Sequence, residues 1–305
     1  MYRAYWAIPR TLKRRDGEQM NAVFGMASML LSILQKEEPD FLLTCFDEGE
    51  ETFRHQEAEG YKEGRAETPD DFYAQIPRII ELLDTFHIRH VSDPRFEADD
   101  LLCAYARKAE GKNMRVTVVS GDRDLLQIVS PSIRIALPHK GYQQTEYLDP
   151  AGVEEKYGIR PNQVASYKGL CGDTSDNLPG VRGIGPKTAV ELLQAYDSLD
   201  GVYAHLADVR PAVREKLEHD REQAFFCQRM AQLISDMELH FSIDDLRLIA
   251  LPTDDILAFF TTMEFTLLTK RFQNFLATPF GQSHFEQPSK PLPQVRGRDD
   301  QLTLF

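Results

Sequence analysis

The sequence has few cysteines and no long apolar run. Its four cysteines are scattered and form no C-x-x-C pair, which argues against a zinc site and a disulfide framework and fits a reducing compartment. No apolar stretch approaches the ~18 residues of a membrane-spanning helix, and the first residues lack the apolar core of a signal peptide. We therefore expect no membrane partner and a cytoplasmic location, in association with the nucleoid if DNA is the partner.

Positive charge is also scarce. Lysine and arginine number 35 against 48 aspartates and glutamates, which gives a net charge of −13, whereas nucleic-acid binders usually carry a basic footprint. The length of 305 residues and the apolar content of 42% fit a soluble globular protein with one large or two ordinary domains. This balance argues against a nucleic-acid partner unless bound metal ions neutralise part of the acids, in which case binding would be strongly salt-dependent.

Short apolar runs alternate with helical segments in the first half of the chain. Residues 69–86 have an apolar period close to 3.6, with Pro77 expected to kink or split the helix, and residues 98–109 are helical by composition. This alternation predicts an α/β domain with a doubly wound parallel sheet. The strand candidates are 41–46, 116–120 and 133–137.

From about Asn162 the pattern is helical with short loops. The candidate helices are 186–195, 213–233 and 254–275. We therefore expect three parts, the last of them a polar, disordered tail. The parts are the α/β domain over 1–160, a helical DNA-binding subdomain over 161–278 and the tail over 279–305.

Eight carboxylates fall in four clusters between residues 47 and 176. In open α/β sheets, ligands bind beyond the carboxyl ends of strands, which is where Asp47, Asp122 and Asp124 fall. So much negative charge in one cleft requires cations, and hard Mg²⁺ or Mn²⁺ takes oxygen ligands. Taken singly, most clusters are also consistent with helix caps or polar turns. The predicted metal ligands are Asp47, Glu97, Asp99, Asp100, Asp122, Asp124, Asp173 and Asp176.

A glycine-rich loop enters a helix directly after the last acid cluster. Glycines permit close backbone approach, Pro186 suits the first helical position, and free amides with Lys187 favour an anion. The alternative is an ordinary tight turn between helices. We interpret the loop as a contact to a phosphate backbone, made by Gly180, Arg182, Gly183, Gly185, Lys187 and Thr188.

Two further segments carry weaker signals. Lys62 and Arg65 are candidates to stabilise a scissile phosphate, with Tyr61 stacking on a base, although solvated basic stretches are common. The last five residues follow a polar linker and are either a flexible terminus or a docking peptide. In the second case the partner contacts are Gln301, Leu302, Leu304 and Phe305.

Several motifs closely resemble the 5′ nuclease domain of bacterial DNA polymerase I, which is related to phage 5′ exonucleases and flap endonucleases. The resemblance runs from residue 2 to about 277, with the motifs in the family's order. They are Tyr2-Arg3-Ala4-Tyr5, Phe46-Asp47, Tyr61-Lys62 with Arg65, Pro69-Asp70-Asp71, Glu97-Ala98-Asp99-Asp100, Gly121-Asp122-Arg123-Asp124 and the stretch from Gly172 to Val181.

The resemblance implies a PIN-like parallel sheet flanked by helices, a helical arch and a helix–three-turn–helix DNA-binding motif. It implies a monomer that cleaves DNA at 5′ flaps, nicks and ends in replication and repair, with RNA primers as a further substrate. Two Mg²⁺ or Mn²⁺ ions would act in hydrolysis, and K⁺ is a further candidate at the hairpin carbonyls. By motif, the predicted ligands up to Asp100 match the family's first metal region, and the predicted ligands from Asp122 onward match its second. The residues that match the base of the arch are Tyr61, Lys62 and Arg65.

The sequence departs from the family in two respects. The family normally begins with an apolar strand that ends in Asp-Gly, whereas Met1 directly precedes the Tyr-Arg-Ala-Tyr match. A start codon assigned too far downstream or a truncated chain explains this difference better than an inactive enzyme does, because every other ligand position is kept. No polymerase domain follows, so the terminal peptide is expected to tether the nuclease to the sliding clamp. The alternatives are a non-catalytic DNA-junction binder on the clamp and a PIN-type ribonuclease.

Overall fold

The computed structural model describes residues 2–48, 52–58, 60–63, 68–139 and 141–289. Its first part alternates helices with short strands. The predicted strands are all present, and the helix predicted over 69–86 is split as expected, with Pro77 in the first turn of its second half. The elements are α1 (Tyr2–Ala7), α2 (Asn21–Glu37), β1 (Leu43–Cys45), α3 (Phe53–Glu57), α4 (Asp70–Tyr73), α5 (Ile76–Thr85), β2 (Arg89–Val91), α6 (Ala98–Glu110), β3 (Val116–Val119), the 3₁₀ turn η1 (Asp124–Ile128), β4 (Ile133–His139) and β5 (Gly141–Leu148).

The rest of the chain is helical. Two predicted helices are each broken in two, at Asp220 and at residues 263–265. Among the described residues, every helix is too short or too polar to cross a membrane. The elements are α7 (Pro150–Tyr157), η2 (Pro161–Gln163), α8 (Val164–Cys171), α9 (Pro186–Tyr196), α10 (Leu199–Ala204), η3 (Leu206–Asp208), α11 (Pro211–His219), α12 (Arg221–Ala231), η4 (Ile243–Leu246), α13 (Thr253–Thr262), α14 (Thr266–Leu276) and α15 (Pro279–His284).

The strands confirm the α/β class but form two sheets among the described residues. β1 pairs in parallel with β2, whereas β3 pairs in parallel with β4, and β4 pairs antiparallel with β5. β5 is antiparallel because a single residue separates it from β4 in the sequence, whereas parallel strands need a longer crossover. β1 and β3 both contact α6, so α6 packs against both sheets, and it carries Asp99 and Asp100 in its first turn.

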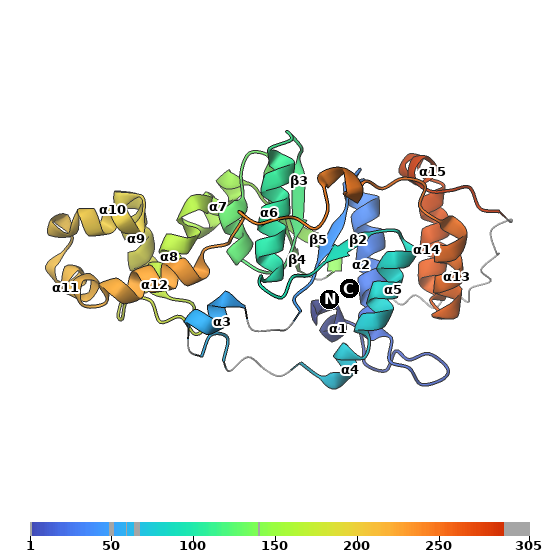
Figure 1. Ribbon diagram of the computed structural model, residues 1–305, viewed down its shortest axis with the longest axis horizontal. Helices are drawn as coiled ribbons and strands as arrows, with labels where there is room; N and C mark the ends of the chain where they lie inside the picture. Colours follow the sequence, from blue (N-terminus) through green and yellow to red (C-terminus); the bar gives the residue numbers. More distant parts are fainter. Residues whose placement is uncertain (1, 49–51, 59, 64–67, 140, 290–305) are drawn as a thin grey trace.

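Two large cores organise the molecule (Figure 1). One lies under β3 and β4 and continues into α8 to α11 at one end of the molecule. The other joins α2 and α5 to α13, α14 and α15 at the opposite end. The sequence-based division placed residues 253–278 with the helical subdomain, but here they pack against the first part of the chain.

The tail predicted to be disordered from residue 279 is ordered as far as residue 289, which corrects that prediction. The rings of Phe280 and Phe285 are buried against Phe275 at centroid distances of 5.9 and 5.6 Å. Leu251 also pairs with Phe285 as an isolated parallel bridge. Aromatic burial therefore offsets the polar composition of this stretch. The predicted docking residues Gln301, Leu302, Leu304 and Phe305 lie outside the described residues.

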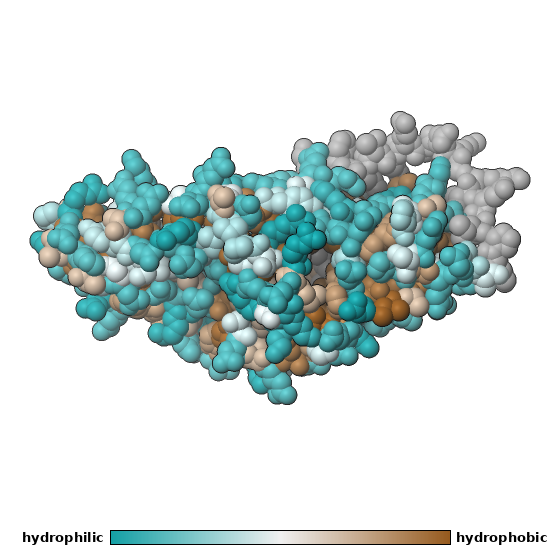
Figure 2. Space-filling model, turned by 90° about the horizontal axis from the view of Figure 1, so that it is seen from above, coloured by the Kyte–Doolittle hydropathy of each residue, from teal (hydrophilic) through white to brown (hydrophobic). Residues whose placement is uncertain are grey.

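Hydrophilic residues cover most of the face of the molecule seen from above (Figure 2). The more hydrophobic residues on that face form small groups between them. This distribution agrees with the charged content of 27%, which is ordinary for a globular protein.

Candidate metal centre and DNA-binding loop

Acids from three segments meet at the amino end of α6. They are Asp47 after β1, Asp99 in the first turn of α6, and Asp122 and Asp124 after β3. Burial raises the pKa of Asp99 well above its ordinary value, and the charges of Asp122, Asp47 and Asp124 raise it further. Asp47 also accepts a hydrogen bond from the amide of Ala98 at 2.8 Å. Four carboxylates from three separate segments are therefore close enough to repel one another electrostatically, which is expected of side chains that share a bound cation.

The second group consists of Asp124, Asp173 and Asp176. One carboxylate oxygen from each lies within 4.8 Å of the other two. Burial raises the pKa of Asp124 to about 6, with Asp122 and Asp176 adding to the effect and Lys168 opposing it. Since Asp124 also interacts with Asp99, the two groups form one acidic site, which we call the carboxylate site (Asp47, Glu97, Asp99, Asp122, Asp124, Asp173 and Asp176).

Lys168 is a functional residue that sequence reasoning missed. It lies on α8, is 9% exposed, and donates hydrogen bonds to both Asp124 and Asp173. Burial would raise the pKa of Asp173, but hydrogen bonds from Lys168 and Ser175 outweigh it and hold that pKa below its ordinary value. The only sequence signal was a lysine five residues before Asp173, which is typical of any exposed helix.

The residues at the predicted base of the arch connect the two halves of the carboxylate site. Lys62 donates to Glu97 at 2.6 Å, and the hydroxyl of Tyr61 lies 3.5 Å from the same carboxylate. The amide of Lys62 also donates to the carbonyl of Asp176 at 3.3 Å. Lys62 therefore lies beside both halves, with its ammonium on Glu97 and its backbone bonded to the backbone of Asp176. Arg65 lies outside the described residues.

Asp100 has a different environment from the other predicted ligands. It is fully buried, and its two oxygens accept bonds of 2.6 and 2.8 Å from the guanidinium of Arg54. The amides of Glu97 and Ile234 also donate to it. Arg54 in turn donates to the carbonyls of Met230 and Gln232. Because these partners occupy both its oxygens, Asp100 holds α3, α6 and residues 230–234 together and does not offer a free oxygen to a metal ion.

The donor set fits divalent metal ions. It consists of carboxylate oxygens, which suit hard cations such as Mg²⁺ and Mn²⁺, and no cysteine or histidine belongs to it among the described residues. The raised pKa values of Asp99 and Asp124 mean that these two carboxylates hold protons more tightly than free aspartates do. A bound cation would relieve the same repulsion.

If the Lys168 ammonium substitutes for part of the charge of a bound cation, replacing Lys168 should make the stability of the protein more dependent on metal ions. We expect Mg²⁺ to raise the melting temperature of Lys168→Met by at least about 2 °C more than that of the wild-type chain, since about 1 kcal/mol corresponds to this shift. Differential scanning fluorimetry over a Mg²⁺ series measures it. Lys156→Met is the matched control, because Lys156 pairs with the surface carboxylate of Glu146. Equal shifts in all three proteins would contradict the role of Lys168.

The glycine-rich loop forms a tight entry to α9. Gly180 has a φ of +63°, and a Cβ there would lie 2.2 Å from the backbone nitrogen of Gly172, so only glycine fits. Gly185 precedes α9 without a side-chain cap, which leaves the first amides of that helix, including those of Lys187 and Thr188, directed outward. Lys187 is exposed.

Two predicted contact residues in this loop already have protein partners. The amide and guanidinium of Arg182 both bond to Asp220 at 2.9 Å, which holds the pKa of Asp220 at about 2. The carbonyl of Gly183 accepts a hydrogen bond from Lys216 at 2.9 Å. Arg182 therefore braces the loop against α12, and Lys187 and Lys216 are the exposed cations beside it.

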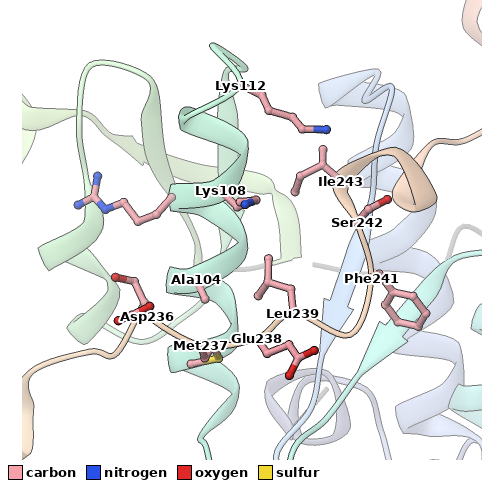
Figure 3. Close-up of a pocket in the computed structure, with 12 residues that line it drawn as sticks. Ala104, Lys108, Lys112, Asp236, Met237, Glu238, Leu239, Phe241, Ser242 and Ile243 are labelled. Carbon is pink, nitrogen blue, oxygen red and sulfur yellow. The ribbon is translucent and has the colours of Figure 1, made fainter.

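A cavity of about 670 Å³ adjoins the carboxylate site and reaches the start of α9. A second cavity of about 620 Å³ lies against the carboxyl-terminal half of α6 (Figure 3), lined by Lys108, Lys112 and residues 235–239 and 241–243. Because the predicted ligands lie at the opposite end of α6, only the first cavity can serve the carboxylate site.

The chain matches two parts of one protein family. Residues 1–158 match the 5′–3′ exonuclease N-terminal resolvase-like domain, and residues 159–254 match the 5′–3′ exonuclease C-terminal SAM fold. DNA polymerase I of Bacillus subtilis is 37% identical over 271 residues, which are 88% of this chain and 31% of that protein. Thermostable DNA polymerase I of Thermus thermophilus is 40% identical over 89% of this chain and 32% of its own length. The chain thus spans about a third of the length of these relatives.

Solved structures show the same fold. The flap endonuclease of bacteriophage T5, crystallised with DNA and metal ions, aligns with a TM-score of 0.60 at 16% identity, over 84% of this chain and 90% of that one. On these matches, the chain belongs to the 5′–3′ exonuclease family of nucleases.

Proposed function

We propose that this chain is a structure-specific 5′–3′ exonuclease and 5′-flap endonuclease that hydrolyses DNA phosphodiesters at the carboxylate site. The observation that carries the proposal is the position of Lys62. Its ammonium binds the Glu97 carboxylate, and its backbone amide bonds to the backbone carbonyl of Asp176, so the residue lies beside both halves of the site. A phosphate held there would lie between the two halves and beside a cation.

The carboxylates around Asp99 would hold one divalent ion, and Asp124, Asp173 and Asp176 a second, with Mg²⁺ or Mn²⁺ as the ions. When bound, two such ions supply an activated water and stabilise the leaving 3′ oxygen. Lys62, released from Glu97, offsets charge on the phosphate. Tyr61 is buried with its hydroxyl beside Glu97, and its ring lies 5.0 Å from the Lys62 ammonium, where it would hold that lysine in position. Arg65 is proposed as a second cation on the phosphate.

The loop of Gly180 to Thr188 would hold the duplex part of the substrate. Its outward amides and Lys187 suit a phosphate backbone. K⁺ is a further candidate ligand of its carbonyls, where it would compete with the Lys216 ammonium for Gly183. We propose that the protein acts as a monomer on nucleoid DNA in the cytoplasm, with RNA primers as an additional substrate.

The decisive test is cleavage by this chain of a 5′-flap DNA in Mg²⁺, in EDTA, and beside an RNA strand of the same sequence. We expect the flap DNA to be cleaved in Mg²⁺ and not in EDTA, and the RNA strand to be cleaved more slowly than the flap DNA. DNA binding without cleavage would instead identify a junction binder, and preferential cleavage of the RNA strand a ribonuclease.

We further propose that Gln301 to Phe305 dock to the sliding clamp, with the leucine and phenylalanine side chains filling a pocket. Deletion of these five residues should reduce capture of the chain by immobilised clamp and leave the cleavage rate on free DNA unchanged, since the tether only raises local concentration. The readout is the bound fraction in a pull-down. Undiminished capture of the shortened chain would refute this part of the proposal.

A further inference from the structure

Arg123 is a cation at the edge of the carboxylate site that the proposed mechanism does not use. It follows β3 and stands between Asp122 and Asp124 in the sequence, and its side chain is exposed. Within the described ranges the guanidinium of Arg123 forms no ion pair, whereas Lys62 and Lys168 each bind a carboxylate of the site. Arg123 therefore differs from these two lysines in that its charge is available to an anionic ligand.

The local backbone accounts for the separation of Arg123 from its acidic neighbours. The Asp122 carboxylate accepts a hydrogen bond from the amide of Asp124 at 2.9 Å, and the Asp124 carboxylate accepts one from Lys168. Arg123 directly precedes the 3₁₀ turn η1 and has helical backbone angles. In such a turn successive side chains point about 120° apart. The three side chains therefore face different directions, and both aspartates already have partners.

Arg123 lines the cavity of about 670 Å³ that adjoins the carboxylate site. The same cavity is lined by the exposed Thr174 and by Pro186, the first residue of α9. Both η1 and α9 contact α8, so the end of β3 and the start of α9 are held by one helix. The cavity therefore leads from the carboxylates to the outward amides of α9.

The charged residues that line this cavity have different environments. The acids among them, Asp122, Asp124 and Asp173, all belong to the carboxylate site, and the cations are Lys168 and Arg123. Lys168 is 9% exposed and donates to two of these acids. Arg123 can instead meet a phosphate without first leaving a carboxylate. A planar guanidinium can also bind two phosphate oxygens at once.

We propose that Arg123 binds a phosphate of the cleaved strand on the duplex side of the scissile phosphate. The inference rests on the proposed function and adds a substrate contact to it. A strand with its scissile phosphate at the carboxylate site and its duplex at the start of α9 passes along this cavity, beside Arg123. Because phosphate contacts carry no sequence information, this contact positions the strand without selecting its sequence.

The first test compares Arg123→Gln with Arg115→Gln in the full chain. Arg115 directly precedes β3, at the opposite end of the strand, and is also exposed and without an ion pair among the described residues. With a 5′-flap DNA in Mg²⁺, we expect Arg123→Gln to raise KM about tenfold and to reduce the salt slope of log KM by about 1, while kcat changes by less than about threefold. Arg115→Gln should match the wild-type chain, and Arg123→Lys should restore the salt slope.

A neutral phosphate analogue in the DNA locates the contact. Single methylphosphonates replace, one at a time, the first few phosphates on the duplex side of the scissile phosphate. At the phosphate that Arg123 binds, the replacement should weaken binding to the wild-type chain but cause no further loss with Arg123→Gln, as in a double-mutant cycle. Fluorescence anisotropy of labelled DNA in EDTA measures the affinities without cleavage.

Three results would overturn the inference: equal effects of Arg123→Gln and Arg115→Gln, additive effects at every methylphosphonate position, or a change confined to the Mg²⁺ concentration that gives half-maximal cleavage. The last result would show that Arg123 acts on the ions and not on the strand. Absence of cleavage by the wild-type chain rejects the nuclease assignment alone, because the anisotropy measurements need no cleavage. Normal cleavage with additive methylphosphonate effects rejects the Arg123 contact alone.

Discussion

Replacing Asp122 and Asp124 together by alanine should abolish cleavage of a 5′-flap DNA in Mg²⁺. Asp124 is the residue that interacts with both halves of the carboxylate site, so its loss with Asp122 removes ligands from both proposed ions. Metal ions supply several kcal/mol of transition-state stabilisation, which corresponds to a rate loss of at least about a thousandfold. Single-turnover cleavage with enzyme in excess measures it.

Binding of the same DNA in EDTA should remain close to that of the wild-type chain. The matched control replaces Asp84 and Asp255, two exposed aspartates outside the site, by alanine, so that net charge changes by the same amount. This control should cleave normally. A rate for the Asp122/Asp124 variant within tenfold of the control would remove the basis of the proposed function.

Replacing Arg54 by methionine should destabilise the protein by about 3–5 kcal/mol, because it leaves the Asp100 carboxylate buried without its partner. Arg54 is 1% exposed and Asp100 is fully buried, so water cannot take the place of the guanidinium. The change also removes the bonds to the Met230 and Gln232 carbonyls. The free energy of unfolding from urea titrations measures the loss.

Glu57→Gln is the control on the same helix, since its pair with Arg229 is exposed and should contribute less than about 1 kcal/mol. The double variant Arg54→Met with Asp100→Leu should recover part of the stability. It removes the isolated charge but leaves the amides of Glu97 and Ile234 without an acceptor. A loss for Arg54→Met as small as that of Glu57→Gln would show that the pair contributes little.

The strands and helices were predictable because apolar period and proline position are local signals. The α/β class, the strand ends beside Asp47 and Asp122, and the helix break at Pro77 all follow from such patterns. The packing of residues 253–285 against α2 and α5 was not predictable, since their sequence is typical of any helical subdomain. The position of residues 253–285 is determined by the tertiary packing of their aromatic rings, which the local sequence does not reveal.

The candidate site shows a similar limit. Asp99 and Asp100 are neighbours in the sequence and were equivalent as predicted ligands. On a helix, successive side chains point about 100° apart, so Asp99 faces the other acids while Asp100 faces Arg54. The roles of Arg54 and Lys168 were missed because a cation far away in the sequence is recognised only by the carboxylates it contacts.

The shared core of α2, α5 and α13 to α15 has a consequence for synthesis on the ribosome. Residues 5–88 cannot complete that core until residues 248–285 have emerged. At about 5–20 residues per second, the intervening stretch takes on the order of ten seconds to make. During that interval the apolar faces of the early helices stay uncovered, while the later, more local helical unit can already close. The nascent chain is therefore expected to need chaperone protection chiefly at its beginning.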